Sequence, residues 1–418
     1  MTTRRSLFLI AGGAIALAGC REQARPTAAV PNVPDVLVAD SRRGLVVLGG
    51  TRPHDLGAAA AVSPDGRLAY AVTGDQANGS VLVRLKPADG VPEGRIVLGG
   101  GWVPRVVSTD GRACALSRAG ASVRPAARAR TSLLVAVEGE QRRYDLGGVV
   151  EPDAFTRDNS GLFVLEWLPA EAPDRYRVRL LDLASGAVQL LVTRNKVPVP
   201  AGAEEEMRGE GRQAVLSADG QLLFTLYTHQ PGHRHTRDLI AGRPGNVHAF
   251  VHVLHLAERW AYCLDLPHPF GEGPAEGHAV AASADGRRLA VVDVTSGSLA
   301  FADATALTIQ RVVTVPAGGG SASLVFAPSG GRADSGRVLV GAGTTVTVLD
   351  GSTGLNGSTG SVAARWPVPG TIRGLGLSPD SARVYAGGAD EVVWLDAGSG
   401  TLLGRAPVEG LTALRHVS

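Results

Sequence analysis

The sequence predicts an all-β protein, a β-propeller of four-stranded antiparallel blades. Three observations predict it. A short turn motif recurs seven times, and glycine (55) and proline (25) are spread along all 418 residues. The strands beside the motif are apolar on both faces, as in Leu289–Val292. Such strands suit sheets that are covered on both sides, and frequent turn residues indicate many short strands.

The recurring motif is an apolar strand, a Ser-x-Asp-Gly turn and a second apolar strand. The turns centre on Asp65, Asp110, Asp158, Asp219, Asp285, Ser329 and Asp380. Their intervals of about 45 to 65 residues fit a propeller blade with insertions. In this turn Asp bonds nearby backbone and Gly adopts the left-handed conformation. We interpret the third copy as carrying inserted residues and the sixth as lacking its Asp, so we expect both turns to be less regular.

A second pattern completes each repeat. An apolar strand ends in Asp, as in Val178–Gly186, Thr345–Gly351 and Val392–Gly400, and a fourth strand follows. The unit is therefore strand A, turn, strand B, loop, strand C, turn and strand D. These blades resemble the YVTN and Trp-Asp repeat propellers, most closely the YVTN type of exported bacterial proteins, over Val36 to Val408. The resemblance implies the fold but no function, since propellers serve as binders, scaffolds and enzymes.

The number of blades is left with two alternatives. The resemblance favours seven blades. However, Val36–Asp40 and Gly44–Leu48 are typical of strands C and D, and Leu411–Val417 is typical of a strand A. Together they predict an incomplete eighth blade that closes the ring and protects the edge strands.

The N-terminus predicts export. Arg4 and Arg5 precede the uncharged apolar stretch Leu7–Gly19, which is too short for a membrane span but suits a signal peptide. Leu17-Ala18-Gly19-Cys20 resembles the lipobox of bacterial lipoproteins, which implies lipidation of Cys20 and cleavage before it. Thr3–Leu9 also resembles a twin-arginine signal, although Ile10 stands where that family often has Lys. Both export routes stay open.

These features divide the chain into three parts. Residues 1–19 form a signal peptide, residues 20–35 a lipidated Cys20 with a proline-containing tether, and residues 36–418 a single propeller domain. We expect the protein on the outer side of the cytoplasmic membrane, or on an outer membrane where one exists. The formal charge is +2 without a run of Lys or Arg, which argues against a nucleic-acid partner.

The longest insertions predict a functional face. Successive loops of a blade alternate between the two faces of a propeller, so B–C and D–A loops share one face. The insertions are all of these two kinds: Arg118–Thr131, Leu168–Arg175, Arg194–Gly211, His229–Val247 and Pro267–Gly277. We expect a protein or small-molecule ligand on this face, over blades two to five.

Candidate binding residues lie in these insertions. Eight of the ten histidines fall between His229 and His278, and Glu204–Glu206 form an acidic run that favours a solvated turn, either helical or irregular. The histidines suit a metal, but His252 and His255 lie on opposite faces of one strand, and no HExxH or CxxC motif accompanies them. We therefore assign no metal and no cofactor. The candidates are His229, His233, Arg234, His235, Arg237, Asp238, Glu206, Arg208, His268 and His278.

Catalytic signatures are missing. The sequence contains no GxSxG elbow and no Walker loop, so we assign no catalytic residue. The prediction is a lipid-anchored, non-catalytic binding or scaffold protein. The alternative is a hydrolase similar to propeller lactonases, with acidic and histidine residues at the channel mouth.

The two remaining cysteines are expected to be unpaired. Cys114 falls on strand B of blade two and Cys263 on strand D of blade four. These blades are not neighbours, and a disulfide requires Cα atoms within about 7 Å.

Overall fold

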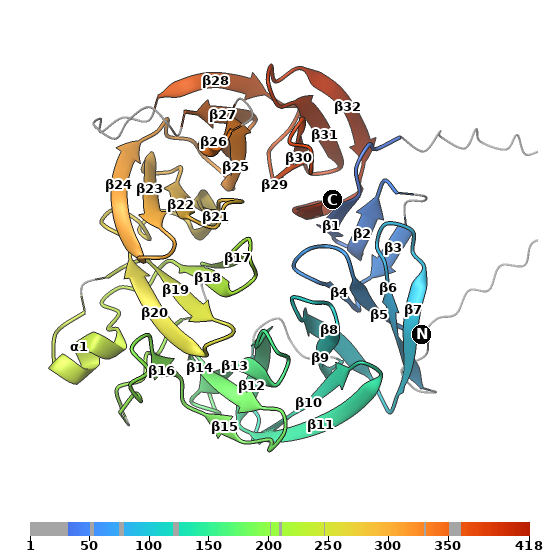
Figure 1. Cartoon of the computed structure of the whole chain (residues 1–418), viewed down its shortest axis with the longest axis vertical. Coiled ribbons are helices and arrows are strands. Elements are labelled where there is room, and N and C mark those ends of the chain that lie inside the picture. Colours follow the sequence, from blue (N-terminus) through green and yellow to red (C-terminus); the bar gives the residue numbers. More distant parts are fainter. Residues whose placement is uncertain are drawn as a thin grey trace, which may run out of the picture. The chain divides into compact units, whose positions relative to one another are not determined.

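The computed structural model confirms the predicted all-β propeller (Figure 1). It describes residues 32–50, 54–74, 79–119, 125–200, 202–208, 211–245, 247–329, 332–350 and 361–418. These belong to one compact unit, Asn32–Ser418. The predicted signal peptide and Cys20 lie outside the described residues. None of the helices in the described part is long and apolar enough to cross a membrane.

Eight sheets surround a central axis, and blades one to seven follow the seven turns of the sequence. In each of these blades the strands run in chain order from the axis outward (Figure 1). Blades one and two consist of β4 (Ala60–Val62), β5 (Ala69–Thr73), β6 (Ser80–Leu85), β7 (Pro92–Leu98), β8 (Trp102–Val107), β9 (Ala113–Arg118), β10 (Arg130–Val137) and β11 (Glu140–Gly147). Blades three and four consist of β12 (Val149–Phe155), β13 (Gly161–Leu168), β14 (Arg175–Asp182), β15 (Val188–Gln189), β17 (Arg212–Leu216), β18 (Leu222–Tyr227), β19 (Phe250–His255) and β20 (Trp260–Asp265).

The remaining elements complete the ring. Blades five to seven consist of β21 (His278–Ala282), β22 (Arg288–Asp293), β23 (Ser298–Asp303), β24 (Thr308–Thr314), β25 (Ser323–Ser329), β26 (Arg332–Ala342), β27 (Thr345–Leu349), β28 (Val362–Pro367), β29 (Gly374–Leu377), β30 (Arg383–Gly387), β31 (Glu391–Asp396) and β32 (Leu402–Pro407). Blade four gains a short parallel strand, β16 (Val192–Thr193), beside β20. Within the described ranges, one α-helix, α1 (Thr236–Ala241), and one 3-10 turn, η1 (Ala275–Gly277), lie in insertions.

Blade eight settles the number of blades. Its strands are β1 (Leu37–Ser41), β2 (Gly44–Leu48), β3 (His54–Gly57) and β33 (Leu411–Val417), in the order β3-β2-β1-β33. The favoured count of seven is therefore wrong, and the eighth blade is complete. The first two strands occupy the B and C positions rather than C and D, because β3 forms the outer edge. The contacts begin before β1: Val33 is buried, and Asp35 pairs with Arg383 and accepts a hydrogen bond from Tyr385.

The recurring turns share one hydrogen-bonded clamp in the six copies that the structure describes. In each copy a Ser or Thr hydroxyl donates to the Asp two residues later, at 2.6 or 2.7 Å in five of them. The same hydroxyl accepts the backbone N–H five residues on. The third turn is as regular as the others, because Asn159 adopts the left-handed conformation (φ 55°) in the place of Gly. That expectation was wrong. The sixth turn falls partly outside the described residues.

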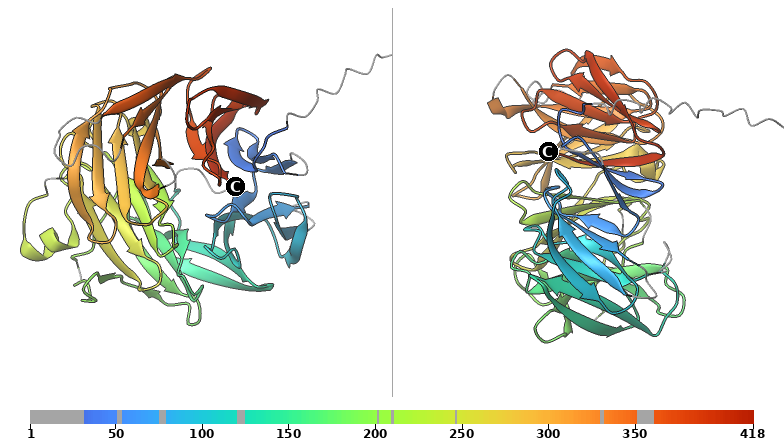
Figure 2. Two further views of the ribbon diagram at one scale, coloured as in Figure 1. Left: turned by 45° about the horizontal axis from the view of Figure 1, so that its top comes forward. Right: turned by 90° about the vertical axis from the view of Figure 1, so that its right-hand side faces the viewer.

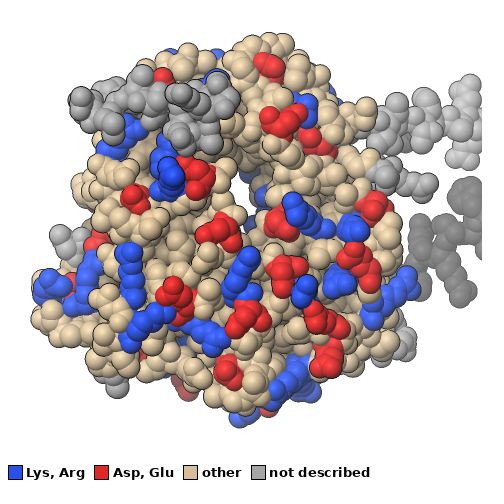
Figure 3. Space-filling model, viewed as in Figure 1, with Lys and Arg blue, Asp and Glu red and all other residues tan. Residues whose placement is uncertain are grey.

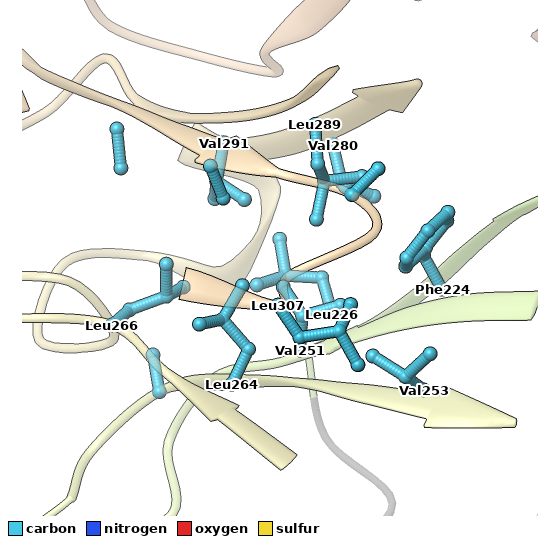
Figure 4. Close-up of a cluster of buried hydrophobic side chains, with 14 of the residues drawn as sticks. Phe224, Leu226, Val251, Val253, Leu264, Leu266, Val280, Leu289, Val291 and Leu307 are labelled. Atoms are coloured by element: carbon cyan, nitrogen blue, oxygen red, sulfur yellow. The ribbon is translucent and has the colours of Figure 1, made fainter. Parts of the chain in front are cut away.

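The core consists of apolar layers between neighbouring blades. Figure 4 shows the layer between blades four and five, where Val251 and Val253 of β19 meet Leu289 and Val291 of β22. Alternate residues of β19 face the other way: Phe250 and Leu254 pack toward blade three. Each blade is therefore covered on both faces by its two neighbours, and the blades form a ring (Figure 2). Cys114 and Cys263 are both buried and unpaired, as predicted.

Candidate functional site

The first four insertions contact one another in sequence, and the fifth lies beside His248, which directly follows the fourth. Arg128 donates its backbone N–H to Ala170, and Arg175 pairs with Glu206 at 2.6 Å. Arg208 donates its backbone N–H to the side chain of Gln230 at 3.0 Å. The rings of His248 and His268 lie 6.5 Å apart. These contacts place neighbouring B–C and D–A loops together, as the strand directions require.

Two of these insertions meet at the outer edge of blade four. The loop between β15 and β17 supplies Glu205, and the loop between β18 and β19 supplies His233 and His235. Strands β19 and β20 supply His252 and Cys263. We call these five residues the Glu205 cluster. Glu205, His233 and His235 have potential ligand atoms within 4.8 Å of one another, and so do Glu205, His252 and Cys263.

The strand part of the cluster is fixed by register. His252 and Cys263 are directly opposed in the antiparallel pair β19–β20. Directly opposed residues point to the same face of a sheet, here the face toward blade three. Both side chains are buried.

The loop part is fixed by extended backbone and by one aromatic ring. His233 forms an isolated bridge with Val247, and His235 has extended dihedral angles (φ −72°, ψ 162°). Residues two apart on extended backbone point the same way, so both rings turn inward. His233 stacks on Phe250 with ring centroids 4.4 Å apart, and His235 meets the same ring edge-on at 4.9 Å.

Glu205 lies at the centre of the cluster. Its Oε2 accepts the Cys263 thiol at 2.9 Å and lies 3.5 Å from Nδ1 of His235 and 3.9 Å from Nε2 of His233. Its Oε1 accepts the backbone N–H of Thr236 at 2.8 Å. Burial alone would raise the pKa of Glu205, but the facing His233 and His235 outweigh it and hold the pKa well below its usual range. Glu205 is therefore a buried carboxylate in its charged form.

His235 lies between two carboxylates. Its Nε2 is 2.5 Å from Oδ1 of Asp265, and Asp265 also pairs with Arg237. Burial alone would lower the pKa of His235, but Asp265 and Glu205 outweigh it and raise the pKa to about 9. His252 lacks such close carboxylates, and burial lowers its pKa to about 4. Burial and the neighbouring Glu205 raise the pKa of the Cys263 thiol well above its usual value.

A pocket of about 760 Å³ opens onto the cluster. Its polar floor includes Glu205, His235, His252 and Cys263. Most of the wall is apolar and comes from β14, β20, α1 and the β15–β17 loop: Val178, Leu191, Val192, Val197, Val199, Met207, Ile240, Ala261 and Tyr262. The size and the mixture of an apolar wall with a few convergent polar groups are typical of small-molecule sites.

Ion pairs hold the pocket wall on the side of blade three. Arg177 binds Glu166 and Glu204, both at 2.8 Å, and Arg179 binds the same two carboxylates. Strand β14 of blade three thus holds the β15–β17 loop one residue before Glu205. Figure 3 shows acidic and basic side chains intermixed over the face that it displays.

The structure brings only some of the predicted residues into this site. His233 and His235 join the cluster, and Arg237 lines the pocket. The acidic run is not helical, and it divides: Glu204 and Glu206 form ion pairs with arginines, while Glu205 turns inward. The other candidates lie elsewhere.

Those candidates have separate environments. His229 contacts Thr228, Asp238 pairs with Arg243, and Arg234 and Arg208 are exposed. His268 is exposed and pairs with Glu272 at 3.0 Å. His278 is fully buried between Pro274, Gly271 and Asp293.

The sequence interpretation did not select Glu205, His252, Cys263 or Asp265 as site residues. The available signal was the pairing of a histidine with a cysteine on adjacent strands C and D of blade four, where blade five carries Ala300 and Val312. That pairing depends on register, which one strand alone does not give.

Comparisons with known proteins support the propeller fold. No protein-family model matches the chain, and no curated protein matches it. The structure of apo AztD from Citrobacter koseri is 12% identical, covers 92% of this chain and 97% of that chain, and gives a TM-score of 0.52. A second structure of Citrobacter koseri AztD is 12% identical, covers 92% of this chain and 96% of that chain, and gives a TM-score of 0.51. The structure of the periplasmic gluconolactonase of Pseudomonas aeruginosa is 16% identical, covers 91% of this chain and 98% of that chain, and gives a TM-score of 0.44. At these identities the AztD structures bear on the fold alone.

Proposed function

We propose that this protein is an exported, lipid-anchored, non-catalytic binding protein that holds a small molecule in the pocket beside the Glu205 cluster. The observation that carries the proposal is this pocket, with its apolar wall and polar floor. The ligand that fits is a mainly apolar molecule with one polar end directed at the floor. The anchor is Cys20, within the Leu17–Cys20 motif.

The chemistry of the floor favours binding over covalent catalysis. A nucleophilic cysteine needs a thiolate, which neighbouring positive charge stabilises. Cys263 instead donates its proton to Glu205, and its pKa is raised well above the usual value. The thiol therefore stays protonated at neutral pH.

The geometry also favours the binder over the hydrolase alternative, whose site was placed at the channel mouth. The Glu205 cluster lies on β19, β20 and their neighbouring insertions, at the outer edge of the ring. In blades three to five the strands nearest the axis are β12, β17 and β21, and they supply no residue of the cluster (Figure 1).

Binding of a fluorescent dye tests the pocket. Anilinonaphthalene sulfonate should bind the full-length protein in detergent, and Ala261→Trp should reduce that binding at least tenfold because the indole fills the pocket. The control is Val312→Trp, which places the same ring on the exposed outer strand of blade five. Equal dye binding by all three proteins would contradict the proposal.

Fractionation tests the anchor. The wild-type protein should sediment with membranes and incorporate labelled palmitate, and Cys20→Ser should incorporate none. Absence of label from the wild type, or equal label in the variant, would contradict lipid anchoring at Cys20.

A further inference from the structure

The Glu205 cluster has the donor chemistry of a transition-metal site. It combines a carboxylate with imidazoles, and imidazole with carboxylate suits zinc and related divalent ions. Two three-residue sets share Glu205: one uses His233 and His235, and the other uses His252 and Cys263. The hydrogen bonds of the cluster distinguish them.

The histidine set contains two ring nitrogens that face Glu205 without a hydrogen bond. Nε2 of His233 and Nδ1 of His235 are buried and make no hydrogen bond within the described part of the chain. Their side chains are 4% and 2% exposed. Buried polar atoms are rarely left without a partner, and such an atom calls for an explanation such as an ion. In the other set, the Cys263 thiol already donates to Glu205.

The spacing of the histidine set is close to that of a bound ion. Ligand atoms of tetrahedral zinc lie about 3.3 to 3.6 Å apart, given metal–ligand bonds of about 2.0 to 2.2 Å. Oε2 of Glu205 lies 3.5 Å from Nδ1 of His235 and 3.9 Å from Nε2 of His233. The first distance falls within that range, the second slightly exceeds it, and all three ligand atoms lie within 4.8 Å of one another.

The surroundings of His235 match the outer shell of a metal site. Histidines that bind metals usually present their other ring nitrogen to a carboxylate or carbonyl, which fixes the ring. Asp265 occupies this position against Nε2 of His235, at 2.5 Å, so Nδ1 faces Glu205. The Phe250 ring packs against the imidazole rings of both histidines. Arg237 binds Oδ2 of Asp265, the oxygen that does not face His235.

We propose that Glu205, His233 and His235 bind one divalent transition-metal ion of the zinc class, with Asp265 as a positioning residue. Three protein ligands leave a fourth position for water or for a ligand group. Glu205 and His235 line the pocket, which gives the ion its entry path. This inference shares the pocket with the proposed function but has a separate test, because dye binding reports the pocket and metal titration reports the ion.

Zinc titration of the full-length protein in detergent tests the proposal. Calorimetry measures the stoichiometry and affinity of binding, and thermal unfolding measures the melting temperature. We expect one ion per chain and a rise in melting temperature. Glu205→Gln and His233→Ala should abolish binding, and Asp265→Asn should weaken it by about 10- to 100-fold. The matched controls Glu206→Gln and His268→Ala, which change the same residue types outside the cluster, should bind zinc like the wild type.

If a variant fails to fold, zinc binding by the wild-type protein still tests the proposal. Absence of zinc binding by the wild type would overturn it and leave a buried histidine–carboxylate ion pair. X-ray absorption at the zinc edge should show only nitrogen and oxygen ligands. A sulfur ligand would overturn the assignment to His233 and His235 and move the ion to the Cys263 set.

Discussion

Blades four and five place different residues at the same position of the fold. In blade four the opposed pair on strands C and D is His252 and Cys263, and in blade five it is Ala300 and Val312. Cys263 is buried beneath insertions, whereas Val312 is 38% exposed. The blade architecture therefore does not require polar side chains at this position.

The layers between blades differ in the same way. The layer between blades five and six is aliphatic apart from aromatic rings such as Phe301. The layer between blades three and four contains Tyr176, Tyr227 and Cys263 beside the buried His252. Since buried polar groups cost free energy unless they are paired, their concentration in one layer indicates a role other than holding the ring together.

The largest expected effect comes from the aliphatic layer. Phe301→Ala removes a buried ring between blades five and six and should lower the free energy of unfolding by about 3 to 5 kcal/mol. Urea unfolding followed by circular dichroism measures it. A loss below about 1 kcal/mol would show that this layer is not what stabilises the ring.

A smaller effect is expected for a polar contact that closes the ring. Asp35→Ala leaves Tyr385 without its carboxylate partner and Arg383 with Asp380 alone, and should cost about 1 to 3 kcal/mol in the same assay. Arg415→Ala breaks the exposed pair with Asp40 in the same blade and should cost less than about 1 kcal/mol. Equal losses would remove the distinction between the two pairs.

The buried histidine of blade five should make stability depend on pH. Burial lowers the pKa of His278, outweighing the Asp293 carboxylate that raises it, and His229 lowers it further. A pKa that is lower in the folded state gives stability that is complete above the unfolded value of about 6.5 and is lost as pH falls below it. The wild type should therefore lose more stability than His278→Asn between neutral pH and about pH 5. Parallel pH profiles of the two proteins would contradict this.

The smallest effect is expected when blade four is given the residue of blade five. His252→Ala installs the counterpart Ala300 and should change the free energy of unfolding by about 1 kcal/mol or less, since water from the pocket can replace the ring. Calorimetric unfolding in chelator measures it. A loss as large as that of Phe301→Ala would mean that the His252 side chain is structural.

The fold was predictable because its signals are local. Ser217 and Asp219, for example, lie two residues apart and form their clamp within one turn. The count of blades was not predictable in the same way, because β33 pairs with β1 across almost the whole chain. The third turn was misread because Asn159 substitutes for Gly in a left-handed position.

The candidate site was predictable only in part. The insertions and the pair His233 and His235 could be selected from composition. Glu205 could not be separated from Glu204 and Glu206, because outside a regular strand or helix no periodicity tells which side chain turns inward. His252 and Cys263 required the register of β19 against β20.

The composition of blade eight determines when the ring can close during synthesis of the chain. Three of its strands are synthesised first and the fourth last, so β1 keeps an open edge until Leu411–Val417 has left the ribosome. An open edge is a template for another chain. A chain truncated before Leu411 would therefore expose the edge of β1 to Leu411–Val417 of a second copy. The full-length chain covers this edge with its own β33.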